Sequence, residues 1–167
     1  MLSVELVPDA AVDAAVRADW ARLDAAGLPH AGRNPSPSNR PHLTLAVRDH
    51  LDIAALAGVQ ELLPLPLHLG GIVLFRHSRR VVVARQVVVS AALLRLHHEI
   101  AERLGAPEPR YANTGRDRWT PHVTLARSVP IERLGEVLQT VAAPEVEGAA
   151  TGLRVWDAAA KIVTTLA

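Results

Sequence analysis

The feature that most constrains the fold of this chain is a six-residue phrase that occurs twice, at Pro41–Ala46 and at Pro121–Ala126. The copies agree at five of six positions, and the one difference exchanges Leu43 for Val123, both apolar and compatible with a strand. Their histidines, at positions 42 and 122, are separated by about half of the 167-residue chain. Each half therefore supplies one histidine and one threonine, and we expect a two-fold-like site in which two imidazoles face each other.

Each copy alternates as a strand with one apolar face would. In the first copy, the two faces carry Leu43, Leu45 and Val47 on one side and His42, Thr44 and Ala46 on the other. A histidine two residues before a threonine places an imidazole and a hydroxyl on the same face, about 6–7 Å apart. We therefore expect the core on one face of each strand and the chemistry on the other.

The composition predicts an aliphatic protein without a broad surface for nucleic acid. Hydrophobic residues make up 49% of the chain but aromatic residues only 3%, so Val, Leu, Ile and Ala must build the core. The formal charge of +1 is too small for the many phosphate contacts that long nucleic acid requires, so we expect any bound nucleic acid to be held at one end. The absence of cysteine excludes disulfides, thiolate metal sites and a thiol nucleophile.

Nothing in the sequence indicates export or a membrane. The first residues lack the basic and then apolar order of a signal peptide, and the apolar stretch 62–75 is interrupted by Pro64, Pro66 and His68. We therefore expect a soluble cytoplasmic protein.

The order of predicted elements repeats between the halves. The expected elements are a strand at 3–7, a helix from Asp9 to Gly27, a loop at 30–40, the first motif strand, a helix at 53–63, strands at 65–75 and 81–89, a helix capped by Ser90, a polar loop at 108–118, the second motif strand, a helix at 131–141, and two strands within 148–166. No long linker or low-complexity block separates the halves. We expect one domain of two similar lobes over residues 1–167, with motifs at 42–44 and 122–124.

Two facing His-x-Thr pairs would supply two acid–base groups and two hydrogen-bond donors. That set matches what the cleavage of a phosphodiester without a metal requires, since one neutral histidine takes a proton while the other, protonated, gives one. The remaining histidines share no metal-ligand spacing, so we expect no zinc site and no cofactor. The adjacent His97 and His98 are expected at the surface or at the boundary of the core. The arginines at positions 76, 79, 80 and 85 are expected either to line a phosphate cleft or, as the favoured interpretation, to lie in a solvated turn.

The doubled motif, its spacing, the approach Arg40-Pro41-His42 and the ending Leu125-Ala126-Arg127 resemble the 2H phosphoesterase superfamily. The similarity is greatest to the bacterial 2′-5′ RNA ligase-like proteins, also described as RNA 2′,3′-cyclic phosphodiesterases. This resemblance implies a bilobal α+β fold in which two antiparallel sheets line a central cleft and helices pack outside. It also implies a hydrolase that opens 2′,3′-cyclic phosphates to 2′-phosphomonoesters in RNA processing, in some members with reversible 2′-5′ ligation.

Carried onto this sequence, the resemblance makes His42 and His122 the acid–base pair and Thr44 and Thr124 the phosphate-binding hydroxyls. Which histidine is the base stays open. Arg127 matches an arginine that often ends the second motif in the family, but strand parity places it away from the site unless the strand ends or bends there. Trp119 and Tyr111 precede the second motif and are expected either to stack on a base or, as the favoured interpretation, to be rim or core aromatics.

Alternative substrates and functions remain open at this point. The substrate is expected to be an RNA 3′ end or a small cyclic nucleotide, with a nucleotide-sugar cyclic phosphate or a 2′-5′-linked oligonucleotide as variants. A catalytically silent module that binds nucleotides or RNA ends in the same cleft is the main alternative, and a purely structural domain is a third. We expect a monomer without an obligate protein partner.

Overall fold

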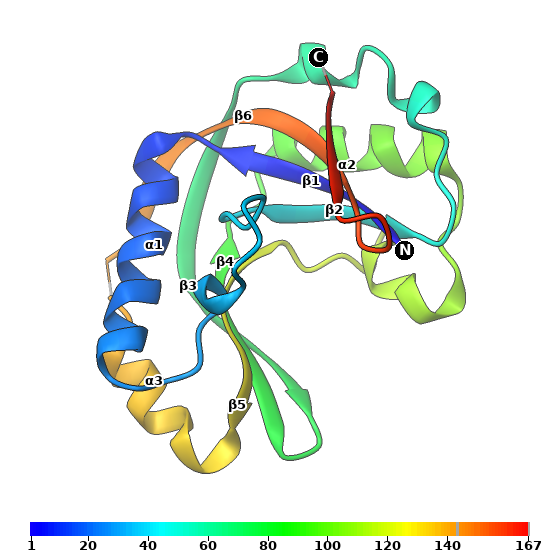
Figure 1. Ribbon diagram of the computed structural model, residues 1–167. Helices are drawn as coiled ribbons and strands as arrows, with labels where there is room; N and C mark the ends of the chain where they lie inside the picture. The colour runs from blue at the N-terminus through cyan, green and yellow to red at the C-terminus, as the bar shows by residue number, and fades with distance from the viewer. Residues whose placement is uncertain (143, 167) are drawn as a thin grey trace.

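Within the described residues, 1–142 and 144–166, seven strands form one antiparallel sheet. In this computed structural model the order is β1-β2-β5-β4-β3-β6-β7, and β1 also pairs with β6, so the first six strands form a closed circuit (Figure 1). The strands are β1 (Leu2–Pro8), β2 (Leu43–Arg48), β3 (Leu65–His77), β4 (Arg80–Val87), β5 (His122–Pro130), β6 (Val146–Asp157) and β7 (Ile162–Leu166).

The circuit has two halves, and each half presents one copy of the repeated phrase. Strand β2 pairs with β1, and strand β5 pairs with β4. The long strand β6 pairs with β3 at its beginning and with β1 over the rest of its length, so it links the halves. The halves also meet where Leu43 of β2 pairs with Val123 of β5. This arrangement confirms the expected bilobal α+β fold.

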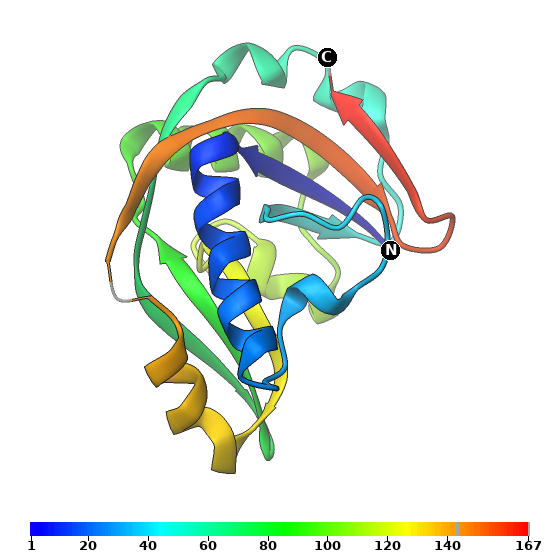
Figure 2. The same cartoon turned by 60° about the vertical axis from the view of Figure 1, so that its left-hand side comes forward.

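In the part of the chain that the structure describes, three α-helices cover the outside of the sheet: α1 (Ala10–Ala25), α2 (Ala91–Leu104) and α3 (Leu134–Thr140). Helices α1 and α3 lie side by side, whereas α2 lies on the opposite side of the molecule (Figures 1 and 2). None of the helices in the described part of the chain is long and apolar enough to cross a membrane.

Helix α1 begins and ends where the sequence predicts. The Asp9 carboxylate accepts a hydrogen bond from the Val12 amide at 2.9 Å, which satisfies one of the free donors of the first turn. The helix turns a regular apolar stripe toward the sheet, and its buried apolar residues are Val12, Val16, Trp20 and Leu23. Gly27, at φ +64°, reverses the chain after the last turn because glycine adopts the left-handed conformation at no steric cost.

Helix α2 follows the same rules. The Ser90 hydroxyl accepts the Leu93 amide at 3.1 Å, and Gly105 at φ +68° follows the last residue. Leu93, Leu96 and Ile100 are completely buried. Each of these side chains contributes about 1.5–3 kcal/mol to stability through removal of apolar surface from water.

The helix predicted over residues 53–63 is wrong. Two short 3-10 helices, Ile53–Leu56 and Val59–Leu62, take its place. Gly58 separates them at φ +81°, a conformation that an α-helix does not contain. The helix predicted over residues 131–141 is confirmed, with a 3-10 turn at Ile131–Arg133 before α3.

Candidate active site

The two copies of the repeated phrase cross at a single point of the sheet. Leu43 pairs with Val123 in antiparallel register. One residue further on each side, that register sets His42 across from Thr124 and Thr44 across from His122. Directly opposed residues in an antiparallel pair have Cβ atoms roughly 4.5–5.5 Å apart, and diagonal neighbours lie somewhat further apart. All four predicted site residues therefore surround one small region.

The two histidines make equivalent backbone contacts. His42 Nδ1 lies 2.7 Å from the Arg40 carbonyl oxygen, and His122 Nδ1 lies 2.8 Å from the Thr120 carbonyl oxygen. A carbonyl oxygen only accepts, so Nδ1 must carry the hydrogen in each ring. The neutral tautomer then leaves Nε2 unprotonated, and Nε2 is the nitrogen that can exchange a proton with a ligand.

Both motif strands carry a bulge at the same position. Thr44 pairs with Glu5 and Ala46 with Val4, so Leu45 is an extra residue relative to β1. In the other half the extra residue is Leu125, since Thr124 pairs with Ala84 and Ala126 with Val83. A β-bulge interrupts the alternation of side chains between the two faces of a sheet.

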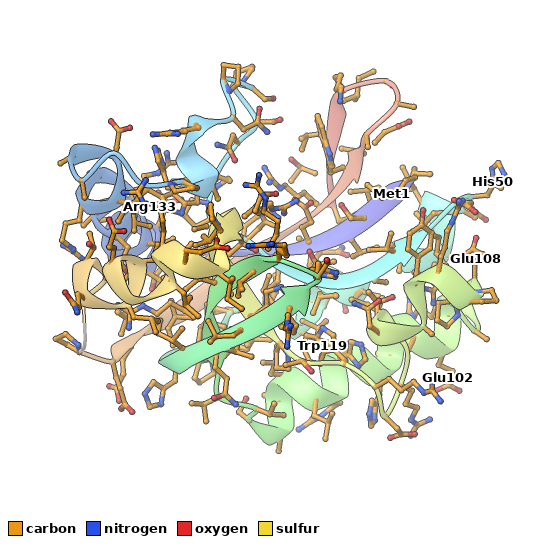
Figure 3. All side chains as sticks on the ribbon, turned by 90° about the horizontal axis from the view of Figure 1, so that it is seen from below. Met1, His50, Glu102, Glu108, Trp119 and Arg133 are labelled. Atoms are coloured by element: carbon orange, nitrogen blue, oxygen red, sulfur yellow. The ribbon has the colours of Figure 1, made fainter. Side chains whose placement is uncertain are left out.

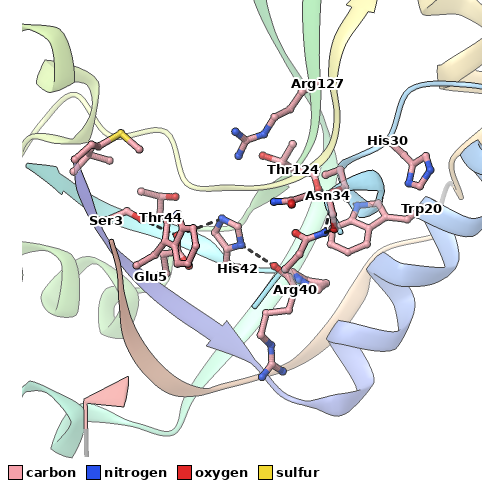
Figure 4. Close-up of a pocket in the computed structure, with 16 residues that line it drawn as sticks. Ser3, Glu5, Trp20, His30, Asn34, Arg40, His42, Thr44, Thr124 and Arg127 are labelled. Atoms are coloured by element: carbon pink, nitrogen blue, oxygen red, sulfur yellow. Dashed lines mark hydrogen bonds and ion pairs between the residues drawn. The ribbon is translucent and has the colours of Figure 1, made fainter. Parts of the chain in front are cut away.

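The bulges determine which face of the sheet carries the side chain of the sixth residue after the proline in each motif. Val47 and Arg127, at equivalent positions of the two motifs, line the same cavity as Thr44 and Thr124. Strict alternation predicts the opposite for both, with Val47 on the face of Leu43 and Arg127 away from the site. Strict alternation therefore fails after the bulges, and Arg127 lies with the threonines, as expected for the case in which the strand bends (Figure 4).

The cavity at the crossing has a volume of about 460 Å³, which lies in the range of small-molecule sites. His42, Thr44, Thr124 and Arg127 contribute to its wall. His122 lies beside this wall, with its ring centroid 4.6 Å from that of Phe75. The wall also contains polar and aromatic residues that were not predicted from the sequence, among them Ser3, Glu5, Asn34, Asn39 and Trp156. The two asparagines lie in the loop before the first motif. Their position in this loop is the one sequence feature that could have identified them as wall residues.

Two tryptophans fix the main chain of the two threonines. Trp20 Nε1 donates to the Thr124 carbonyl at 3.2 Å, and Trp119 Nε1 donates to the Thr44 carbonyl at 2.9 Å. The ring of Trp119 stacks on that of His97 with a centroid distance of 4.0 Å and an interplanar angle of 2°. This face of the indole is thus occupied inside the protein, which agrees with the favoured interpretation of Trp119 as a core aromatic.

Three further side chains named from the sequence lie away from the cavity. Tyr111 donates its hydroxyl to Asp49 and does not line the wall. His97, expected at the surface or at the boundary of the core, is 1% exposed, and Trp119 stacks on its ring. Arg85, expected in a solvated turn, is buried and paired with Asp19 of α1.

The two histidines have different electrostatic surroundings. Burial lowers the pKa of His122, and the nearby Arg127 guanidinium and His42 lower it further, against the opposing effect of the Thr120 carbonyl. His122 is therefore predominantly neutral near pH 7. His42 instead faces a carboxylate, since its Nε2 lies 3.7 Å from Glu5 Oε1.

Two sheet halves that bring paired His-x-Thr motifs together at one cavity define the two-histidine class of phosphoesterases. The family model of the 2′-5′ RNA ligase superfamily matches residues 12–161. The chain therefore belongs to this superfamily, the 2H phosphoesterases, which comprises enzymes that cleave or join phosphate esters. A comparison with curated protein sequences finds no significant match.

Solved structures with the same fold have low sequence identity to this chain. The Thermus thermophilus protein TT0787 is 20% identical with a TM-score of 0.59, covering 99% of this chain and 94% of its own. Escherichia coli LigT in complex with NADP+ is 18% identical with a TM-score of 0.54, covering 98% and 92%. Kluyveromyces marxianus Usb1 is 12% identical with a TM-score of 0.53, covering 99% and 96%. These similarities establish the shared fold.

Proposed function

We propose that the protein is a metal-independent phosphodiesterase that hydrolyses 2′,3′-cyclic phosphates, at RNA 3′ ends or on small nucleotides, to 2′-phosphomonoesters. The observation that carries this proposal is the Leu43–Val123 register, because it brings two imidazoles and two hydroxyls together on one face of the sheet, where the two motif strands cross. Structures of neighbours with nucleotides add support, since LigT was solved with NADP+ and with 3′-AMP and Usb1 with uridine monophosphate.

In the proposed reaction, neutral His122 takes a proton from water through Nε2. The oxygen of that water forms a bond to phosphorus while the bond from phosphorus to the ribose 3′ oxygen breaks. Protonated His42 gives its proton to the leaving 3′ oxygen, so the products are a 2′-phosphomonoester and a free 3′ hydroxyl. The low pKa of His122 supports its role as the base.

Thr44, Thr124 and Arg127 would bind the non-bridging phosphate oxygens. Negative charge on these oxygens grows as the fifth bond to phosphorus forms, and donors that are already in position stabilise it without reorganisation. Both threonine carbonyls are held by indole N–H groups, which fixes the strands that carry the hydroxyls. The same contacts would serve 2′-5′ ligation, in which the 5′ hydroxyl of a second RNA end replaces water as the nucleophile. A 2′-5′ linkage then forms while the bond from phosphorus to the ribose 3′ oxygen breaks.

The test is turnover of 2′,3′-cyclic AMP, and of a short RNA ending in a cyclic phosphate, in excess chelator. We expect a 2′-phosphate product, detected by phosphorus NMR, and a loss of about 10²–10⁴-fold in rate for His42→Ala or His122→Ala. His50→Ala, at an exposed position outside the cavity, is the control. Loss of wild-type activity in chelator would contradict a metal-independent mechanism. Tight binding of the cyclic nucleotide without turnover would instead support a silent binding module.

A further inference from the structure

Glu5 is a buried carboxylate on the cavity wall beside His42. It is 3% exposed, lies on β1 and pairs in register with Thr44 of β2 on one side and Arg154 of β6 on the other. One of its oxygens, Oε2, accepts Arg154 Nε at 2.8 Å and lies 2.7 Å from Nη2. The other oxygen, Oε1, accepts the Ser3 hydroxyl at 2.7 Å and lies 3.7 Å from His42 Nε2 (Figure 4).

The equivalent position in the other half carries no charge. Glu5 pairs with Thr44, whereas the residue that pairs with Thr124 is Ala84. At the sixth position after the proline the charged residue belongs to the other motif: the first motif has the uncharged Val47, and the second has Arg127. The two motifs are thus nearly identical in sequence, but an anion flanks His42 and a cation flanks His122.

Several other groups surround His42, and they leave Glu5 Oε1 as its anionic neighbour. Arg154 of β6 is engaged by Oε2 of Glu5 and by the Ser38 carbonyl. Arg40 of the preceding loop offers its carbonyl to His42 Nδ1, while its guanidinium lies 3.3 Å from Asp13. His122 and Arg127 approach from β5. Among residues 1–142 and 144–166, Glu5 supplies the one carboxylate within 4 Å of the His42 ring nitrogens.

We propose that Glu5 is a positioning residue that commits His42 to the role of general acid. This inference rests on the proposed function. The carboxylate sets a negative charge 3.7 Å from His42 Nε2, the nitrogen that gives up the proton in the proposed reaction, and its hydrogen bonds with Ser3 and Arg154 hold the carboxylate in place. Beside His122 the corresponding charge is the Arg127 guanidinium, so the pair of side chains divides the acid and base roles between two histidines of equal sequence context.

A general acid matters only when the leaving group needs a proton. In a 2′,3′-cyclic phosphate the leaving group is the ribose 3′ oxygen, a poor leaving group without protonation. In 3′-deoxyadenosine 2′-(p-nitrophenyl phosphate) the leaving group is p-nitrophenolate, which departs as an anion. A loss of the acid therefore affects the first substrate and spares the second, whereas general damage to the site affects both.

The experiment compares the wild type with Glu5→Gln on these two substrates over a range of pH. We expect kcat for 2′,3′-cyclic AMP to fall about 10-fold, with KM changed less than about 2-fold, and kcat for the p-nitrophenyl ester to stay within about 2-fold. Glu108→Gln is the matched control, because Glu108 is also a carboxylate near an arginine, Arg48, but lies outside the cavity at the edge of the molecule (Figure 3).

Removal of one partner of a buried ion pair can prevent folding, so a second variant is needed. In the double variant Glu5→Gln/Arg154→Met both charges are removed together, which avoids an unpaired buried guanidinium. We expect the same selective loss on the cyclic substrate. Circular dichroism and the melting temperature show whether each variant is folded.

The outcomes separate this inference from the proposed function. An active wild type whose variants lose equal activity on both substrates would show that Glu5 has a structural role alone. A wild type that turns over neither substrate would overturn the proposed function, and the catalytic role of Glu5 with it.

Discussion

The indole nitrogen of Trp119 donates to the main-chain carbonyl of Thr44 at 2.9 Å, so a residue that leads into the second motif holds the threonine of the first. The indole of Trp20 holds the Thr124 carbonyl of the second motif in the same way. These carbonyls lie beside the point where β2 and β5 separate, and the indoles provide donors there. Each motif therefore depends on a tryptophan from outside its own strand.

The Trp119 hydrogen bond gives a first prediction. Trp119→Phe keeps an aromatic ring against His97 but removes the donor to Thr44. We expect the free energy of unfolding to fall by about 0.5–1.5 kcal/mol, the net value of one buried hydrogen bond. Because Thr44 loses its anchor, kcat should fall more than KM rises. Urea denaturation and steady-state kinetics measure the two effects, and a variant with wild-type stability would show that the contact is weak.

The two histidines are expected to act as a unit. Each single substitution, His42→Ala or His122→Ala, removes one proton transfer and lowers the rate by about 10²–10⁴-fold. The double variant should be little worse than either single variant, because the residual reaction no longer uses acid–base catalysis. Single-turnover rates for the three variants test this. Multiplicative losses would mean that the histidines contribute independently.

The pH dependence of His122 gives a third prediction. Burial, Arg127 and His42 lower its pKa. The proposed base therefore stays neutral, and able to accept a proton, at pH values below about 6.5, the usual pKa of histidine. Activity is lost as the pH falls through the pKa of the base. Arg127→Met removes one of the lowering effects, so the acid limb of the kcat/KM profile should move to higher pH.

Arg127→Lys is the matched control for that shift. It keeps the positive charge near His122, and the acid limb should stay close to that of the wild type. An acid limb that is the same in the Met variant and the wild type would show that Arg127 does not contribute to the lowered pKa of His122.

The buried ion pair between Asp19 and Arg85 gives a prediction about stability. Both side chains are 2% exposed, and Arg85 also donates to the Ala142 carbonyl. Asp19→Asn leaves a buried guanidinium without its anion, which we expect to cost about 3–5 kcal/mol of unfolding free energy. The double variant Asp19→Asn/Arg85→Met should recover part of this loss in thermal or urea denaturation. Equal losses in both variants would contradict the ion-pair explanation.

Much of the fold could be predicted because its signals are local. Asp9 and Ser90 mark the starts of α1 and α2, and Gly27 and Gly105 follow their ends. These signals act through the next turn of the same helix, so sequence is sufficient to find them. The predicted helix at 53–63 failed because the apolar spacing outweighed Gly58, whose positive φ was not apparent from the pattern.

The candidate site could be predicted in part. The repeated phrase identified His42, His122, Thr44 and Thr124, since four chemically suited residues at matched spacing leave a signal in the sequence alone. Glu5 and Arg154 left none, because an acid and a base 149 positions apart become partners only when β1 and β6 pair. Arg85 looked like a turn residue for the same reason, as its partner Asp19 lies on a different element.

The sequence by itself determined the two-fold plan of the protein and the four residues of the candidate site, because both depend on a short segment that is repeated along the chain. The tertiary structure decided how that symmetry is broken. The bulges at Leu45 and Leu125 turned Val47 and Arg127 toward the cavity, and strand pairing set Glu5 opposite one threonine and Ala84 opposite the other. Register and bulges depend on contacts between distant strands, and these contacts give two nearly identical motifs opposite electrostatic surroundings.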